Sequence, residues 1–425
     1  MGSTLFISFI VLIIIGAPIA ISLGLSSLVA IFTGSTVPLT LIPQRMFTAA
    51  DSFPMMAIPF FMLAGALMES GGISRRLINL AKKLVGHFTG GLAMVGVVAC
   101  MFFAAISGSG PATVAAIGGI MVPYMIREGY NKSFSSAVMA IAGSIGVIIP
   151  PSIPMVTYGV SAGASIGSMF TAGIIPGILI GIALMIASYF ICKKNGYGIG
   201  EGRFSIKEFI IALKDAFWAI LMPVIILGGI YGGFFTPTEA AAVAVAYGFI
   251  IGFFVYKEIK LKDLKNIFLD SAVSTATVMI IISAASAFGW ILTAERIPDA
   301  VAVGFTKLTD SPIIYMLLIN LLLLIVGTFM ETNAAIIILT PIFLPLAIRL
   351  GIDPIYFGII MVCNLAIGMV TPPLGVNLFV ACGISKITIE QITKAVIPLI
   401  LTNIAVLLLL TFVPQIITFL PKVLM

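Results

Sequence analysis

The amino-acid sequence predicts an all-α protein that crosses a membrane many times, and three observations lead to that prediction. Apolar residues make up 60% of the 425-residue chain and charged residues only 9%, which is too little charge to cover a soluble domain. Apolar stretches of roughly 20 residues, long enough to cross a hydrocarbon core of about 30 Å, recur along the whole chain. The sequence lacks the period-two alternation of a membrane β-barrel.

The apolar stretches give the predicted elements in order. The first, Leu5 to Phe32, is too long for the core of a signal peptide and follows no basic residue, so we interpret it as a retained, tilted helix. Spanning helices are expected at residues 4–33, 54–70, 132–163, 168–192, 214–234, 237–256, 271–293, 354–384 and 388–411. Two more stretches, 88–128 and 312–350, contain a polar break and are expected to be re-entrant hairpins that add no net crossing.

The basic residues support this arrangement. With a cytoplasmic N-terminus, 17 Lys and Arg side chains lie inside and 5 outside, as the positive-inside rule expects. The five outer residues are Arg45, Arg296, Lys307, Arg349 and Lys422. The net charge of +6 therefore reports membrane orientation rather than nucleic-acid binding.

An internal duplication relates the two broken stretches. Prolines, glycines and other residues recur at a constant separation of 222 positions. The pairs are Ile120 and Ile342, Pro123 and Pro345, Arg127 and Arg349, Gly129 and Gly351, Gly146 and Gly368, Pro150 and Pro372, and Pro151 and Pro373. Five crossings lie between the hairpins, and an odd number inverts the second copy, an arrangement typical of secondary transporters.

The duplication divides the chain into five parts. The first part is a scaffold helix and linker (1–53), and the third consists of cytoplasmic loops and scaffold helices (193–270). The second part is the first repeat (54–192), with hairpin 88–128 and broken helix 132–163. The fourth is the second, inverted repeat (271–411), with hairpin 312–350 and broken helix 354–384, and a C-terminal tail (412–425) follows it.

Each repeat is predicted to carry a polar hairpin tip opposite a helix interrupted at a double proline. The tips are Ser107-Gly108-Ser109-Gly110 and Thr328 to Asn333, and the interruptions are Pro150-Pro151 and Pro372-Pro373. Non-helical backbone at membrane depth survives only where it is buried in protein or lines a cavity. Unwound carbonyls and hydroxyls are hard ligands for a small cation, and half-helix N-termini favour a carboxylate. The hydroxyls belong to Ser107, Ser109, Thr113, Thr328 and Thr332.

Structural interpretations compete at these positions. Pro111 fits the first turn of a half-helix, and Thr328 to Glu331 has capping-box spacing, so Glu331 is about equally a cap or an ion ligand. Thr236 to Glu239 repeats that spacing without a polar break and predicts a plain helix start. The two tips could be kinks that bind nothing, but two inverted kinks in register make that the minority interpretation.

Other functions are excluded by the residue types. The single histidine, His87, stands at a segment end, and the four cysteines lie far apart, so neither a hydrolytic triad nor a zinc cluster can be assembled. The phosphate-binding loop of an ATPase is missing from the sequence. We therefore expect an ion gradient, rather than ATP, to supply the driving force, and no enzymatic activity.

Several long strings identify a family resemblance over essentially the whole chain. They are "IPFFMLAGALMESGG" (58–72), "FAAISGSGPATVAAIGGIMVP" (103–123), "IIPPSIPMVTYG" (148–159), "FTPTEAAAVA" (235–244) and "GTFMET" (327–332). Together they resemble the large membrane subunit of tripartite ATP-independent periplasmic (TRAP) transporters. The resemblance implies an elevator-type ion transporter fold in the bacterial inner membrane and sodium-coupled uptake of an organic acid. It also implies a periplasmic substrate-binding protein and a small four-helix membrane subunit, expected here as a separate chain.

The resemblance also implies site residues. One sodium ion would be framed by Ser107, Gly108, Ser109, Gly146 and Pro150, and the other by Gly327, Thr328, Thr332, Gly368 and Thr371; the substrate would lie near Ser109, Ser152, Tyr158, Asn333 and Asn377. Pro111 stands where the family's tip often has a second small polar residue, so the role of that side chain stays open. Among the family's cargoes, the chain most resembles the sialic-acid type.

Two rivals remain at this point. A stand-alone sodium/dicarboxylate symporter or ion antiporter of the same broad superfamily would work without a binding protein. A membrane-embedded enzyme or scaffold would need a catalytic cluster in a loop, and the loops are too short and too poor in acid, histidine and cysteine to supply one.

Overall fold

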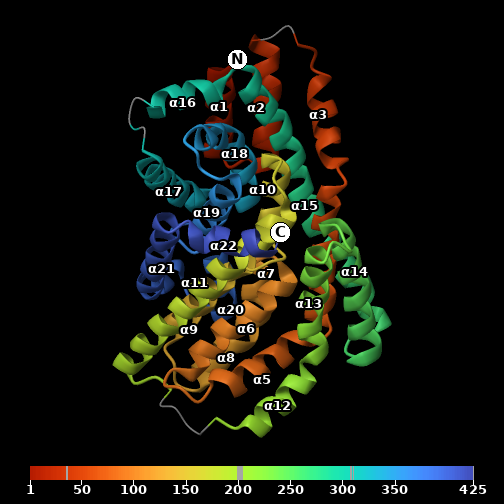
Figure 1. Ribbon diagram of the computed structural model, residues 1–425, viewed down its shortest axis with the longest axis vertical. Helices are drawn as coiled ribbons and strands as arrows, with labels where there is room; N and C mark the ends of the chain where they lie inside the picture. Colours follow the sequence, from red (N-terminus) through yellow and green to blue (C-terminus); the bar gives the residue numbers. More distant parts are fainter. Residues whose placement is uncertain (35–36, 199–203, 307–308, 310, 425) are drawn as a thin grey trace.

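The computed structural model describes residues 1–34, 37–198, 204–306, 309 and 311–424, and every regular element in these ranges is a helix. Within these ranges, six helices are long and apolar enough to cross a membrane, or up to eight if each of two bent helix pairs counts as one span. The chain is thus a multi-pass membrane protein. Figure 1 shows an elongated molecule in which α3 (Leu41–Ala50) and α15 (Leu261–Ala294) run along one side and the two hairpins lie beside them.

The prediction of one helix over 4–33 is wrong. The chain forms α1 (Gly2–Ile14) and α2 (Ile19–Gly34), which pack against each other. Gly16 has a positive φ of 82° and Pro18 follows it, so the helix ends there and the chain folds back. A Cβ on Gly34 would lie 3.2 Å from the Met1 Cα, so both ends of this helical pair meet. The linker expected after it is largely helical as well, because α3 lies within it.

This pair also determines which end of the molecule holds the N-terminus. The Met1 amino group lies 3.5 Å from a Glu295 carboxylate oxygen, which also accepts a 2.9 Å hydrogen bond from the Gly2 N–H. The N-terminus therefore lies at the same end of the molecule as Arg296, whereas we expected it inside and Arg296 outside. The N-terminus cannot lie inside while Arg296 lies outside, because the first apolar stretch folds back instead of crossing once.

The inverted repeats are confirmed by the order of helices. The first hairpin consists of α6 (Gly91–Ser107), the short α7 (Gly110–Thr113), a π-helical turn (Val114–Gly118) and α8 (Gly119–Arg127). The second consists of α17 (Pro312–Phe329) and α18 (Thr332–Arg349), whose bounds repeat the outer bounds of the first hairpin at a separation close to 222 residues. Each arm of the second hairpin is long enough to span by itself, but its tip meets the first tip inside the molecule, which identifies both as re-entrant.

Both broken helices are confirmed as well. In the first repeat α9 (Lys132–Gly143) tightens into a 3₁₀ turn (Ser144–Val147), and α10 (Ile153–Ala162) begins after the double proline. In the second, α19 (Pro354–Gly368) and α20 (Val376–Ser385) flank the other double proline, and both Pro–Pro bonds are cis. The repeats continue with α11 (Ile166–Asn195) and α21 (Ile389–Phe412).

The remaining spans agree with the sequence, with changed bounds. They are a 3₁₀ turn (Pro54–Met56) with α4 (Ala57–Ser70), α13 (Phe217–Tyr231), and α14 (Pro237–Ile250) with a π-helical turn (Ile251–Val255). Besides α3, the sequence prediction missed four shorter helices, namely α5 (Ile73–Val85), α12 (Ile206–Asp215), α16 (Ile297–Thr306) and α22 (Gln415–Leu424). They are too short to span, so a search for 20-residue apolar stretches could not find them. The last one occupies most of the expected C-terminal tail.

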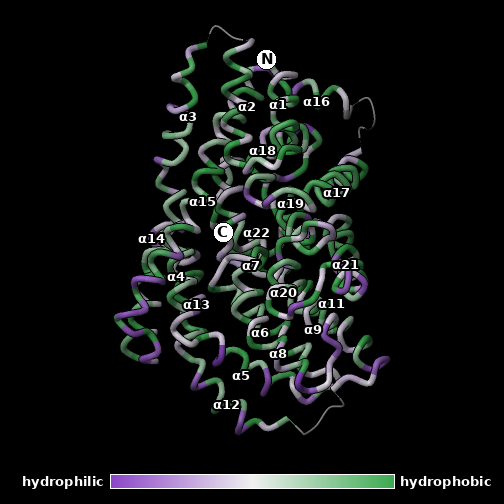
Figure 2. The backbone as a smooth tube through the Cα atoms, turned by 180° about the vertical axis from the view of Figure 1, so that it is seen from behind, coloured by the Kyte–Doolittle hydropathy of each residue, from purple (hydrophilic) through white to green (hydrophobic). Residues whose placement is uncertain are grey.

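Charged contacts gather at the end of the molecule that holds α5 and α12, where Figure 2 shows hydrophilic backbone segments. The Arg76 guanidinium lies 2.7 Å from the Glu258 carboxylate and 3.7 Å from the centre of the Tyr256 ring, which ties α5 to the segment after α14. Lys83 bonds to Glu208 at 2.6 Å, and this hydrogen bond lowers the pKa of the Glu208 carboxyl. Arg76 and Lys83 belong to the side that the positive-inside rule assigns to the cytoplasm.

Candidate functional site

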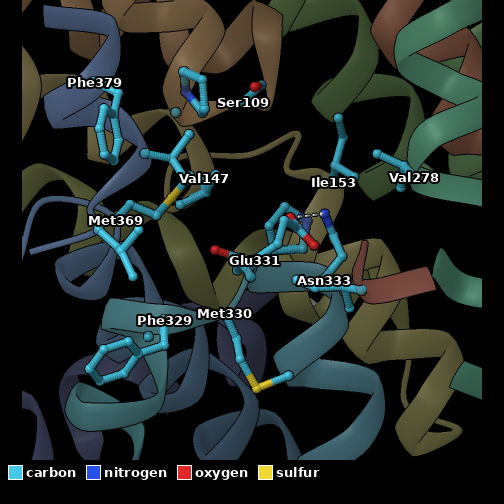
Figure 3. Close-up of a pocket in the computed structure, with 18 of the residues that line it drawn as sticks. Ser109, Val147, Ile153, Val278, Phe329, Met330, Glu331, Asn333, Met369 and Phe379 are labelled. Carbon is cyan, nitrogen blue, oxygen red and sulfur yellow. Dashed lines mark hydrogen bonds between the residues drawn. The ribbon is translucent and has the colours of Figure 1, made fainter. Parts of the chain in front are cut away.

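The two hairpin tips meet over one central cavity of about 460 Å³. Figure 3 shows Ser109 of the first tip on one side of it and Glu331 and Asn333 of the second on the other. The broken helices close the cavity with Val147 and Ile153 from the first repeat and with Met369 and Phe379 from the second. The N-terminal residues of α10, α18 and α20 line it, so three helix N-termini, each with partial positive charge, face one space.

At the first tip, three oxygen atoms converge, namely the Ser107 and Thr113 hydroxyls and the Ser109 carbonyl. The Ser107 and Thr113 hydroxyl oxygens are 2.9 Å apart, and the Thr113 hydroxyl donates to the Ser109 carbonyl at 2.7 Å. Gly108 has a φ of 60°, a left-handed conformation that favours glycine, and its carbonyl accepts a hydrogen bond from the Ile153 N–H at 3.3 Å. The tip is therefore fastened to the start of α10, on the far side of the double proline.

Gly146 leaves room for this oxygen cluster. A Cβ on Gly146 would lie 2.5 Å from the Thr113 hydroxyl oxygen and 2.6 Å from the Ser109 carbonyl oxygen. The structure thus brings Ser107, Gly108, Ser109 and Gly146 together, four of the five residues proposed around the first ion. Pro150 lies in the turn just before Pro151, whose carbonyl oxygen would be 2.9 Å from a Cβ on Gly108.

The second tip is built differently. Glu331 is the N-cap of α18, and its carboxylate accepts from the Ala334 N–H at 3.0 Å and from the Asn333 side-chain amide at 2.8 Å. The predicted capping box is wrong in detail, because α17 continues through Phe329 and leaves Thr328 inside that helix. The Thr328 hydroxyl donates back to the Ile325 carbonyl at 2.7 Å instead of reaching α18. At the other predicted capping box, Thr236 to Glu239, the structure confirms a plain helix start.

Two features of the second tip are typical of a ligand-binding site, namely a buried hydroxyl without a partner and a close contact between two backbones. Thr332 is 2% exposed, and its buried hydroxyl has no hydrogen-bond partner among the described residues. Gly327 and Gly368 touch backbone to backbone, since a Cβ on Gly368 would lie 2.5 Å from the Gly327 Cα. Gly327 thus contacts Gly368 and lines the same cavity as Thr332, while the Thr371 hydroxyl bonds to the Ile367 carbonyl at 2.8 Å within its own turn.

Each tip also contacts the broken helix of the opposite repeat. Asn377 on α20 lies against Gly110 and donates to the Ala140 carbonyl at 3.1 Å, and its side-chain oxygen has no partner among the described residues. Thr157 on α10 donates to the Asn333 side-chain oxygen at 2.9 Å. The second tip is therefore hydrogen-bonded to α10 of the first repeat, whereas the first tip is only in contact with α20 of the second.

The structure does not bring every predicted substrate residue to the cavity. Ser109 and Asn333 line it, and Asn377 lies just behind the first tip. Ser152 is buried as the cap of α10, where its hydroxyl donates to the Val147 carbonyl at 2.6 Å. The Tyr158 hydroxyl donates to the Pro354 carbonyl at 2.7 Å, so this ring joins the two repeats away from the cavity.

Sequence reasoning missed the apolar part of the lining. Phe329, Met330, Met369, Leu374 and Phe379 face the cavity, although a search for polar tips could not select them from a chain that is apolar throughout. The only usable signal was their position, within the second polar tip or a few residues before or after the second double proline. Among the described residues, no Lys, Arg or His lines the cavity, and nowhere do three His, Cys, Asp or Glu side chains gather as a metal cluster would require.

Comparisons with known proteins agree with this architecture. The family model described as "Tripartite ATP-independent periplasmic transporter, DctM component" matches residues 6–416. The isethionate TRAP transporter permease protein DctMQ of Oleidesulfovibrio alaskensis is 53% identical over 97% of this chain, which spans 65% of that relative's length.

Two further relatives match over nearly their full lengths. The C4-dicarboxylate large permease protein DctM of Rhodobacter capsulatus is 42% identical over 98% of this chain and 97% of its own length. The sialic acid large permease protein SiaM of Vibrio cholerae is 40% identical over 97% and 96%.

A solved structure shows the same fold at low identity. The YdaH transporter of Alcanivorax borkumensis covers 88% of this chain, which covers 87% of it, with a TM-score of 0.65 and 14% identity. The curated relatives compared above are transport permeases and not enzymes. A match over almost the entire chain, together with two facing hairpins in inverted repeats, shows that this protein belongs to the DctM family of large permease components of TRAP transporters.

Proposed function

We propose that this chain imports a small organic anion together with sodium ions, by sliding its hairpin-bearing body along a scaffold that includes α3 and α15. The meeting of two hairpin tips over one cavity carries the proposal, because a binding site between inverted repeats suits alternating access from two sides. The family suggests the remaining parts, which are the inner membrane, a periplasmic binding protein and a small membrane subunit.

Oxygen geometry at the tips supports sodium as the coupling ion. The Ser107, Ser109 and Thr113 oxygens converge on the space beside Gly146, and the buried Thr332 hydroxyl lacks a partner at the other tip. Neutral hydroxyls and carbonyls suit a hard monovalent cation better than a transition metal, which prefers nitrogen or sulfur ligands.

The charge in the cavity gives a reason for coupling. The described lining includes the Glu331 carboxylate and no basic side chain, so an anion that enters alone meets a like charge. A cation bound beside each tip would offset that charge and leave the three helix N-termini to attract the anion. In this proposal sodium binds first and creates the anion site.

The residues that line the cavity also limit which anions are suitable substrates. It is largely apolar, with few hydrogen-bonding groups, of which Ser109 and Asn333 are the clearest. A compact anion with few hydroxyls fits such a surface, since each unpaired polar group of a buried ligand is costly. Isethionate is therefore our first candidate and a C4-dicarboxylate the second, in line with relatives at 53% and 42% identity. Sialic acid, suggested by the sequence, stays a prediction and ranks third.

The orientation follows from charge. We place the end with α5 and α12 in the cytoplasm, because most Lys and Arg residues gather there. The N-terminus, which is paired with Glu295 at the opposite end, then faces the periplasm.

The test is uptake into proteoliposomes that contain this chain and its small partner. Labelled isethionate, succinate and sialic acid are each supplied with and without the binding protein and an inward sodium gradient. Uptake of one anion that requires both is expected. Uptake without the binding protein would instead support a stand-alone symporter, and accumulation without a sodium gradient would overturn the coupling.

A further inference from the structure

Another cavity, of about 430 Å³, lies between the scaffold and the hairpin-bearing body. It is above the central cavity, where "above" means towards the end of the molecule that holds the N-terminus and Glu295. On the scaffold side it is lined by Arg45 of α3 and by Ser286 and Trp290 of α15, and on the other side by Ser161 and Pro341. The Arg45 guanidinium carbon lies 5.6 Å from the centre of the Trp290 ring. Among the described residues, no carboxylate lines this upper cavity. Arg45 takes part in none of the ion pairs between described residues.

The opposite end of the same scaffold face carries the opposite charge. Below the central cavity, a space of about 440 Å³ shares Ser109 and Ile153 with it and leads to one of about 560 Å³ lined by Glu69, Asp263 and Asp270. Glu69 and Asp270 line both lower spaces, so the three cavities follow one another from the tips towards the cytoplasmic end. The described lining of these two lower spaces contains no basic side chain.

Helix α15 gives the distances between these sites. The central cavity touches it at Val278, the upper one at Ser286 and Trp290, and the lower ones at Asp270. At 1.5 Å per residue, Ser286 and Trp290 lie about 12 and 18 Å above Val278, and Asp270 lies about 12 Å below it. Figure 1 shows α3 beside the upper part of α15, where the two helices pack. A slide of the tips by about two to three helical turns would place them opposite Arg45.

We propose that Arg45 is the scaffold half of an anion-binding site that forms when the hairpin tips stand at the outer end of α15. This inference rests on the proposed sliding function. There the guanidinium, held over the Trp290 ring, donates charge-assisted hydrogen bonds to the carboxylate or sulfonate group of the cargo. It supplies the cationic side chain that the central cavity lacks.

The same charge pattern explains release. When the tips stand at their present, lower position, the cargo is separated from Arg45 and faces a route lined by Glu69 and Asp270. These carboxylates lower the local concentration of an anion and raise that of a cation. The scaffold thus changes the affinity for the anion between the two positions, although the tips that hold it stay the same.

The experiment compares Arg45→Gln with Arg45→Lys in the full complex, with labelled isethionate and succinate delivered by the binding protein. Arg45→Gln is expected to slow uptake about tenfold with an unchanged half-saturating sodium concentration, and Arg45→Lys to recover at least a third of the rate. Arg349→Gln is the matched control, because Arg349 lies at the same end, pairs with Asp299 at 3.1 Å and lines none of these cavities. Wild-type uptake in Arg45→Gln would overturn the inference.

A chemical rescue experiment distinguishes the effect of the positive charge at position 45 from the effect of the size of the side chain. Arg45→Cys is treated with a positively or a negatively charged methanethiosulfonate, while the four natural cysteines are buried. Recovery with the positive reagent alone is expected, and equal effects of both reagents would contradict the proposal. Docking of the binding protein is measured in parallel, because a tenfold loss of docking in Arg45→Gln would make Arg45 a docking residue instead. Failure of the unsubstituted complex to transport would overturn the proposed function itself, and the inference with it.

Discussion

The two hairpin tips occupy equivalent places in the repeats, yet their chemistry differs. At the first tip the hydroxyls of Ser107 and Thr113 pair with each other and with a backbone carbonyl. At the second, a carboxylate caps the returning helix and the buried Thr332 hydroxyl has no partner in the described structure. Duplication fixed where the backbone breaks, while the side chains at each break diverged. We therefore expect the tips to respond differently to substitution, except where both depend on a glycine.

The largest effect is expected where the shared backbone geometry is disturbed. In Gly368→Ala the new methyl group would lie 2.5 Å from the Gly327 backbone, which cannot move aside as a flexible side chain can. We expect uptake to fall more than tenfold and the complex to lose about 1–3 kcal/mol of stability. Gly146→Ala should do the same at the first tip, because it displaces the Ser109 carbonyl.

Gly119→Ala is the control for both glycine variants, since a Cβ there meets nothing within 4 Å. Uptake rates and thermal unfolding in detergent are measured for all three. A normal rate in Gly368→Ala would show that the second tip does not need this close backbone contact.

The next effect distinguishes the charge of Glu331 from its role as a cap. Glu331→Gln retains an oxygen that can accept from the Ala334 N–H but removes the carboxylate charge. If the charge helps to hold a cation, the half-saturating sodium concentration should rise about tenfold, as expected for loss of a buried charged interaction. Glu239→Gln, in the capping box of α14, removes a capping charge far from the cavity and serves as control. An unchanged sodium dependence in Glu331→Gln would leave Glu331 with a structural role only.

A smaller effect is expected at the first tip, where the oxygen groups are neutral. Ser107→Ala removes one hydroxyl of the cluster, and the loss of about 1 kcal/mol corresponds to a roughly fivefold rise in the half-saturating sodium concentration. Ser109→Ala should change sodium dependence less, because Ser109 joins the cluster through its carbonyl. Ser135→Ala, which removes a buried hydroxyl bonded to the Asn131 carbonyl, is the matched control. Equal shifts in Ser109→Ala and Ser107→Ala would contradict this assignment.

The sequence predicted the backbone plan better than the side-chain roles. Paired glycines and prolines at a constant separation located both hairpins and both broken helices, because few residues tolerate such breaks. The fold-back at Gly16 and Pro18 was missed because the apolar run continues through it, and hydrophobicity does not report where a helix ends. Ser152 and Tyr158 were placed near the substrate by resemblance, but their hydroxyls bond to the Val147 and Pro354 carbonyls away from the cavity. Spacing along the chain cannot show which direction a hydroxyl faces.

The smallest effect is expected at Thr328, a residue that its place in the second polar tip and the family resemblance had put among the ion ligands. Its hydroxyl donates to the Ile325 carbonyl within α17, a bond that competes with the helix and contributes little to its stability. Thr328→Ala should therefore change uptake and the half-saturating sodium concentration less than twofold. Thr332→Ala should raise the half-saturating sodium concentration severalfold, because the Thr332 hydroxyl is buried and unpaired in the described structure. Sodium titrations of the two variants, prepared side by side, check this. A large effect in Thr328→Ala would mean that its hydroxyl turns towards the cavity when the ion binds, so that the second tip rearranges while the first is already assembled.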